Sequence, residues 1–134
     1  MILTTKEYGA ANSGLPLILI HGMGSAATAW QLVVPELAKS YRVITVDLPG
    51  HGETQLPAGL DMSPKSLAGY VLETMDSLNI SKAHLVGNSL GGWTALELAV
   101  IQPERVASIL GLAPAGLWLA PFNVRYQAPQ LREI

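Results

Sequence analysis

Ser89 is the residue whose neighbours point most clearly to chemistry. It lies in the sequence Gly87-Asn88-Ser89-Leu90-Gly91-Gly92, directly after an apolar run and before another. A Gly-x-Ser-x-Gly pattern between a strand and a helix is typical of a nucleophile elbow, where the serine backbone is strained and residues two positions away must lack side chains. The turn also places Ser89 at a helix N-terminus, whose free N–H groups favour a developing oxyanion. The pattern therefore predicts a serine nucleophile.

The elements that would position this turn alternate along the chain. Apolar and β-branched runs predict strands, and apolar residues at helical spacing predict the helices between them. Ser63-Pro64 is a strong helix start, because a capping residue precedes a proline at the first helical position. The expected strands are residues 2–8, 15–20, 42–47, 83–86 and 106–112, and the expected helices are 30–37, 64–78 and 90–101. This order predicts an α/β fold of three layers, with a mainly parallel sheet and helices on both faces.

Composition restricts the possible partners. The 134 residues suit one domain, and the net charge of −2 without any cluster of Lys and Arg argues against nucleic-acid binding. There is no cysteine, so neither disulfides nor thiolate chemistry are expected. The mean hydropathy of +0.32 is high for a small domain, which indicates that some apolar surface is made for a partner.

A membrane span is not expected. Val106–Val124 carries no charge before Arg125, but Pro114 and Pro121 interrupt it, which favours a strand followed by a loop. The N-terminus lacks the charged and apolar regions of a signal peptide, and we expect a cytoplasmic protein. We expect no metal and no cofactor.

Three motifs in register carry a family resemblance. They are His21-Gly22-Met23-Gly24, Asp47-Leu48-Pro49-Gly50-His51-Gly52 and the Ser89 turn. With these motifs the chain resembles the α/β-hydrolase superfamily over nearly its whole length, as the N-terminal half of such a protein. The Asn88-Ser89 pair and the glycines after Leu90 are most similar to the superfamily's ester hydrolases and carbon–carbon bond hydrolases.

The resemblance implies a role for each matching position. Ser89 would be the nucleophile, and the N–H groups of Met23 and Leu90 would form the oxyanion hole. His21, Gly22, Asp47, Gly87 and Gly91 would support the site. The substrate would be a small-molecule ester, and no cofactor would be required. A serine rather than an aspartate at position 89 disfavours chemistry through an alkyl-ester intermediate.

The chain departs from the family in its histidines. In the superfamily the acid and then the histidine follow the serine. After Ser89 this chain has Glu97, Glu104 and Glu133, but its three histidines, His21, His51 and His84, all precede the serine. Two functions therefore stay open: a serine hydrolase of ester type, or the N-terminal half of one, and an inactive fragment that serves as a binding or assembly module. A carbon–carbon bond hydrolase would differ from the first only in its substrate.

The existing histidines have two interpretations. His21 and His51 should lie at the carboxyl edge of the sheet with Asp47, where a makeshift Ser89–His–Asp47 group could form. We favour the other interpretation, in which His21 and Asp47 brace the oxyanion loop and His51 packs under its own loop, because a triad requires a specific hydrogen-bonding geometry. We expect His84 at the opposite edge, on the surface.

The end of the chain predicts an interface. A sheet that stops after Val106–Leu112 exposes an apolar edge strand, which invites pairing with another chain. We divide the chain into a core, residues 1–116, and a lid or interface segment, residues 117–134. Trp118 and Phe122 could line an acyl pocket or pack against a partner. We expect self-association, or a complementing chain that supplies the acid and histidine, through Val106–Leu112 and Leu117–Phe122.

Overall fold

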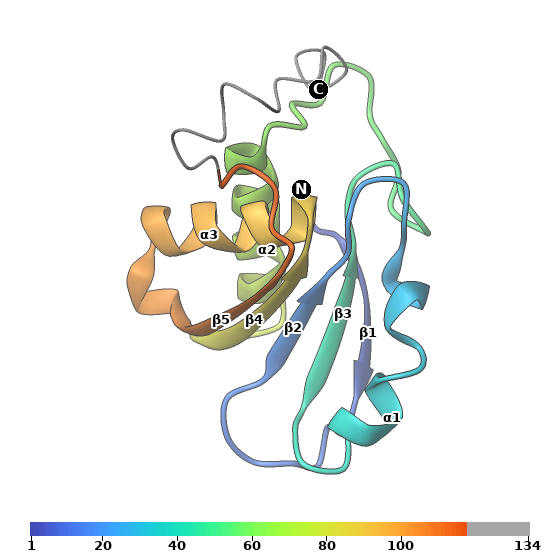
Figure 1. The fold of residues 1–134 in the computed structure, drawn as a ribbon, viewed down its shortest axis with the longest axis vertical. Coiled ribbons are helices and arrows are strands. Elements are labelled where there is room, and N and C mark those ends of the chain that lie inside the picture. The colour runs from blue at the N-terminus through green and yellow to red at the C-terminus, as the bar shows by residue number, and fades with distance from the viewer. Residues whose placement is uncertain (118–134) are drawn as a thin grey trace.

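A five-stranded sheet forms the centre of the computed structural model, which describes residues 1–117 (Figure 1). The strand order is β1-β3-β2-β4-β5, with β1 antiparallel to β3 and the other neighbours parallel. In chain order the elements are β1 (Thr4–Tyr8), β2 (Leu17–Ile20), η1 (Ala27–Trp30), α1 (Val34–Leu37), β3 (Val43–Asp47), α2 (Pro64–Ser77), β4 (Ala83–Asn88), α3 (Leu90–Ile101), η2 (Pro103–Arg105) and β5 (Val106–Leu112). The predicted fold class, a mainly parallel α/β sheet with helices on both faces, is confirmed.

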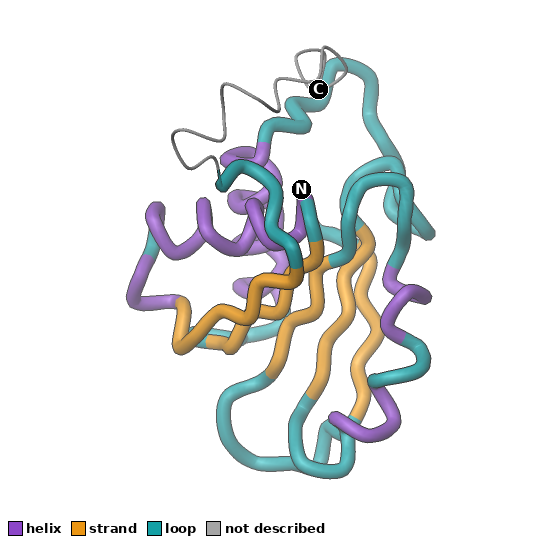
Figure 2. Tube along the Cα trace, in the orientation of Figure 1, coloured by secondary structure: helices purple, strands orange, loops and turns teal. Residues whose placement is uncertain are grey.

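The two faces of the sheet are covered unequally (Figure 2). Side chains alternate along a strand, so Ile18 and Ile20 pack in the larger core with α2 and α3, whereas Leu17 and Leu19 pack with Trp30 in a smaller one. The larger core contains Leu67, Val71, Met75, Leu85 and Leu98. On the other face, η1 and α1 are short, and they contribute Trp30 and Val34 to the smaller core.

The helix predicted over residues 30–37 is wrong in extent. The structure has two separate short helices there, η1 and α1, and neither has a side-chain cap. Pro35 lies within α1, but only four residues of the segment are α-helical, too few for a stable helix by itself. Packing of Trp30 and Val34 onto β2 and β3, rather than helix propensity, therefore holds this segment in place.

The helices on the opposite face agree more closely with the sequence. Ser63 accepts a hydrogen bond from the N–H of Ser66 at the start of α2, as its cap position predicts. The helix α3 spans the predicted residues, and Val100 on its outer side is 79% exposed. Within residues 1–117 no helix has the length and hydropathy of a membrane span, and Val106–Leu112 is a strand.

Candidate active site

The three loops singled out in the sequence meet at one edge of the sheet. The parallel strands β2, β3 and β4 end at Ile20, Asp47 and Asn88, so the residues that follow them share the carboxyl edge. Gly22 lies against the elbow, because a Cβ added there would be 3.3 Å from the Asn88 carbonyl oxygen and 3.4 Å from the Ser89 Cβ. The loop that starts at His21 is thus directly beside Ser89.

The turn at Ser89 has the strain that its sequence predicts. Its φ of 51° and ψ of −113° are unusual for a residue with a side chain. Gly87 and Gly91 leave room for the turn, because a Cβ would lie 2.3 Å from the Gly91 carbonyl oxygen in the first case and 2.1 Å from the Ile20 carbonyl oxygen in the second. Gly92 lies between Pro114 and the sheet, because a Cβ there would be 2.7 Å from the Pro114 Cβ and 3.1 Å from the Gly87 carbonyl oxygen of β4. The close approach to β2 is made by Gly91.

Backbone hydrogen bonds tie the strained turn to β5. The Ser89 N–H donates to the Leu112 carbonyl at 3.0 Å, and the Ser89 carbonyl accepts from the N–H groups of Trp93 and Ala115. The Ser89 side chain makes no capping hydrogen bond to α3. The hydroxyl is consequently not engaged by its own helix.

Two N–H groups are available for an oxyanion. Among residues 1–117, the N–H groups of Met23 and Leu90 have no hydrogen-bond partner. Leu90 is the first residue of α3, where the unpaired N–H groups and the helix dipole attract negative charge. Met23 is 55% exposed in the loop beside Ser89. The assignment of these two donors to an oxyanion hole stays a prediction that this arrangement permits.

His21 is engaged on both ring nitrogens. The Leu48 N–H donates to its Nε2 at 3.0 Å, so Nε2 carries no hydrogen, and Nδ1–H donates to the Gly22 carbonyl at 2.7 Å. The side chain is only 1% exposed. Burial lowers the pKa of His21 below its ordinary value of 6.5, and the neighbouring His51 lowers the pKa further, whereas the Gly22 carbonyl and Asp47 raise it. His21 is a neutral bridge between two loops.

His51 makes the same kinds of hydrogen bond as His21, but from the loop after β3 to the loop after β2. Its Nε2 accepts from the Gly24 N–H at 3.0 Å, and its Nδ1–H donates to the Pro49 carbonyl at 2.9 Å. The His21 and His51 rings lie against each other, with centroids 5.0 Å apart. His51 thus contacts its own loop, as expected, and also the loop after β2. The contact with Gly24 could not be predicted from sequence patterns, because it joins residues far apart in the chain.

Asp47 braces backbone rather than a histidine. Its carboxylate accepts from the N–H groups of Ala27 at 2.7 Å and Glu53 at 3.0 Å. Gly52 leaves the space that the carboxylate occupies, since a Cβ there would be 2.3 Å from it. No hydrogen bond links Asp47 to His21 or His51, nor any of the chain's three histidines to Ser89. The makeshift triad is not formed.

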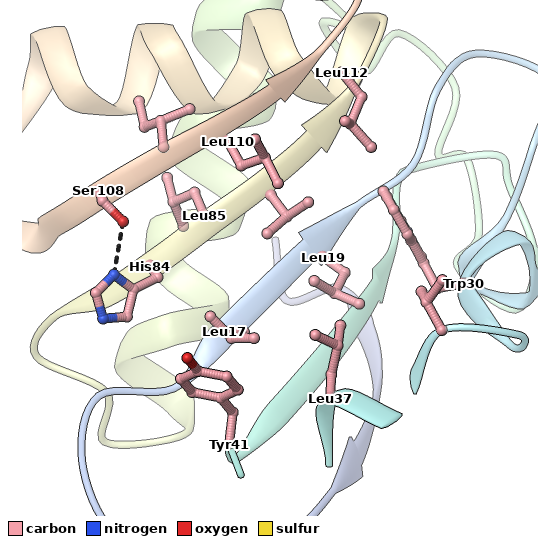
Figure 3. A pocket seen from close by; sticks show the side chains of 13 residues that line it. Leu17, Leu19, Trp30, Leu37, Tyr41, His84, Leu85, Ser108, Leu110 and Leu112 are labelled. Carbon is pink, nitrogen blue, oxygen red and sulfur yellow. Dashed lines mark hydrogen bonds between the residues drawn. The ribbon is translucent and has the colours of Figure 1, made fainter. Parts of the chain in front are cut away.

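His84 lies in a second feature, an apolar groove on the face that α1 leaves open (Figure 3). His84 is partly exposed, at the edge of the sheet opposite Ser89 as expected, and its Nδ1 is hydrogen-bonded to the Ser108 hydroxyl at 2.7 Å. The groove has a volume of about 560 Å³. We call it the sheet groove; its main lining residues are Leu17, Leu19, Trp30, Val86, Leu110 and Leu112.

The segments predicted for an interface are only partly described. Val106–Leu112 is β5, which pairs with β4 alone among the strands of residues 1–117. Of Leu117–Phe122, only Leu117 lies inside the described residues, so Trp118 and Phe122 lie outside them. Within residues 1–117 there is also no group of three or more side chains suited to bind a metal ion.

Fold and site together define a class: an α/β protein with a strained serine turn at the carboxyl edge of a parallel sheet. A sequence model described as the alpha/beta hydrolase fold matches residues 16–130. The chain therefore belongs to the α/β-hydrolase family, and the resemblance seen in its motifs is confirmed.

The similar proteins are named for different activities. The chain is 43% identical over 110 residues to the 2-hydroxymuconate semialdehyde hydrolase of Pseudomonas sp. strain CF600, covering 80% of this chain and 39% of that protein. It is 46% identical over 118 residues to a dihydrolipoyllysine-residue acetyltransferase component of an acetoin cleaving system from Pseudomonas putida, covering 87% of this chain and 31% of that protein. Among solved structures, a marine microorganism esterase is 28% identical with a TM-score of 0.78, covering 99% of this chain and 51% of its own. The chain thus spans less than half the length of these two curated relatives.

Proposed function

We propose that this chain carries the nucleophile and oxyanion hole of a serine hydrolase that acts on small-molecule carboxylic esters. The observation that carries the proposal is the strained Ser89, beside a loop and a helix end that each present an unpaired N–H group. Preorganised donors at the position of a developing oxyanion supply a large part of acyl-transfer catalysis, and loss of one costs about 3 kcal/mol.

The reaction would use Ser89, the two N–H groups and a base. The Ser89 Oγ bonds to the ester carbonyl carbon, and the π electrons move to the carbonyl oxygen, which the Met23 and Leu90 N–H groups stabilise. The C–O bond to the alcohol then breaks, and the alcohol leaves with the proton that a base took from Ser89. Water subsequently releases the acid and restores the serine hydroxyl.

The base in this scheme must come from outside the 134 residues. His21 and His51 use both ring nitrogens in hydrogen bonds, and His84 is bonded to Ser108 on β5. We propose that a further stretch of polypeptide contributes the histidine and acid, either in a complementing chain or as part of a longer protein. The sheet groove and the free edge of β5 are the surfaces on which it would pack, or on which a second copy would associate.

A second candidate is a binding or assembly module without catalysis. The absence of any histidine bonded to Ser89 favours it for this chain by itself. A third, a carbon–carbon bond hydrolase, is favoured by the relative named 2-hydroxymuconate semialdehyde hydrolase. It would use the same serine site on a different substrate.

Active-site labelling separates catalysis from assembly. The purified chain is treated with a fluorophosphonate at pH 8 and analysed by intact mass and peptide mapping, with Ser89→Ala as the control. A serine hydrolase site gives one adduct on Ser89 that the control lacks. An adduct on another residue, or no adduct, contradicts catalysis by this chain alone. Hydrolysis of short p-nitrophenyl esters, compared with turnover of a dienoate ketone, then separates ester from carbon–carbon bond cleavage.

A further inference from the structure

The two histidines at the sheet edge form a reciprocal pair. His21 belongs to the loop after β2; it donates to Gly22 in its own loop and accepts from Leu48 in the loop after β3. His51 belongs to the second loop; it donates to Pro49 in its own loop and accepts from Gly24 in the first. Each loop thus supplies one ring that receives a backbone N–H from the other.

The residue that His51 contacts is the third residue of a type II turn. Residues 22–25 form this turn, since the Ser25 N–H donates to the Gly22 carbonyl at 3.2 Å and Gly24 has a φ of 71°. Met23, the second residue, is not among those with positive φ. A type I turn keeps the same closing hydrogen bond but has a negative φ at its third residue.

The two turn types differ in the orientation of the central peptide between Met23 and Gly24. In the type II turn the Gly24 N–H points to the unprotonated Nε2 of His51. Reversing this peptide would bring the Met23 carbonyl oxygen to the same side, where two acceptors would face each other. His51 therefore favours the type II turn over the type I turn.

The preceding peptide, between Gly22 and Met23, is held by His21. The Gly22 carbonyl accepts from the His21 Nδ1–H and from the Ser25 N–H. Because a trans peptide is planar, fixing this carbonyl also fixes the opposite direction of the Met23 N–H. The peptides on both sides of Met23 are consequently each anchored by one histidine.

We propose that His51 is a positioning residue for the oxyanion loop, acting through the Gly24 N–H to hold the turn that presents the Met23 N–H. The inference rests on the proposed function for its catalytic consequence, but its structural part concerns the chain alone. His51 makes its hydrogen bonds to Gly24 and Pro49 and none to Ser89. Its effect passes through the shape of the turn.

Two substitutions separate the hydrogen bond from the bulk of the ring. His51→Phe keeps a planar ring without an acceptor, and His51→Gln keeps an acceptor without the ring. In the unmodified chain at pH 8, we expect a scalar coupling between the Gly24 amide nitrogen and the His51 Nε2 across the hydrogen bond. We also expect the strong Met23 Hα to Gly24 amide NOE of a type II turn. The NOE should weaken in His51→Phe and return in His51→Gln.

The rate of fluorophosphonate labelling at Ser89 is the second measurement. Complete loss of an oxyanion donor costs about 10²–10³-fold, so a loosened turn should slow labelling about tenfold in His51→Phe, with His51→Gln within about threefold of the unmodified chain. Amide spectra of both variants establish that each remains folded.

The outcomes distinguish the two proposals. No coupling in the unmodified chain, or an undiminished NOE in folded His51→Phe, overturns the assignment of His51. Equal labelling rates despite an altered turn also overturn its positioning role. If no protein is labelled while the turn changes as expected, catalysis by this chain alone fails and the structural role of His51 stands. If His51→Phe does not fold, a weakened NOE or slow labelling in folded His51→Gln contradicts the acceptor as the cause.

Discussion

At the scale of single residues, the site depends on side chains that serve backbone rather than substrate. His21, His51 and Asp47 together accept four backbone N–H groups and donate to two carbonyls. Buried hydrogen-bonding groups are costly to leave unpaired, at about 1–3 kcal/mol each. The loops around Ser89 are therefore held by groups that a motif search would assign to catalysis.

His21 makes the stability of the fold depend on pH. Burial lowers its pKa in the folded chain, so between its ordinary value of 6.5 and the lowered value the unfolded chain binds a proton that the folded chain does not. The free energy of unfolding should then fall as the pH falls below 6.5, and be fully recovered above it.

Urea unfolding at a series of pH values between 7.5 and 5, about the range in which histidine titrates, measures this effect. A His21→Gln variant should be less stable throughout, but its stability should depend less steeply on pH. His84 is present in both proteins and cancels in the comparison. An equal or steeper dependence in the variant would contradict the lowered pKa.

The residue patterns predicted less of the site than of the fold. The turn at Ser89 follows from Gly87, Ser89 and Gly91, because local sterics dictate its geometry. The contact from His51 to Gly24 is not predictable in this way, since the two residues belong to different loops. The rings face each other only after the sheet has aligned the ends of β2 and β3.

At the scale of elements, α3 depends on its close approach to β2. Gly91→Ala would place a Cβ 2.1 Å from the Ile20 carbonyl oxygen, and backbone atoms on both sides would have to move. We expect a loss of at least about 3 kcal/mol in the free energy of unfolding, measured by urea denaturation.

Gly69 offers the matched control for this change. It lies within α2, and a Cβ there would meet nothing within 4 Å. Gly69→Ala should stabilise the chain by about 0.5–1 kcal/mol, because alanine loses less backbone entropy in a helix. If both variants lost stability equally, the packing of Gly91 against β2 would not be the cause.

The helices α2 and α3 were predicted more accurately than the segment of η1 and α1. The apolar residues of α2 share one face, so periodicity locates that helix, whereas α3 is located by its long apolar run between the Ser89 turn and Pro103. The segment of η1 and α1 has apolar residues at similar spacing, but it packs through Trp30 and Val34 as two short pieces. Tertiary contacts decide such a segment, and its sequence alone suggested one continuous helix.

At the scale of the whole molecule, the sheet groove extends onto β5, the last strand of the sheet. Leu110 lies in the groove and is 57% exposed. We expect the chain to self-associate at micromolar concentration, because burying such side chains removes apolar area from water at about 25 cal/mol per Å². Leu110→Glu should weaken the association at least about tenfold, since it would place a charge in an apolar contact.

Val100 provides the control for surface charge. It is 79% exposed on α3 and does not line the groove, so Val100→Glu should leave association unchanged. Sedimentation over a range of concentrations measures both, with circular dichroism to verify folding. A monomeric unmodified chain, or equal effects of the two substitutions, would contradict an interface at the sheet groove.

The strain at Ser89 affects which residue would be kept at this position during evolution. A residue in a sparsely populated backbone region costs about 1–3 kcal/mol, and glycine at position 89 would relieve much of it. If selection acted on folding alone, the backbone strain of this serine would lower stability, and mutation to glycine would be favoured. Only a use for its hydroxyl gives a lineage a reason to keep it.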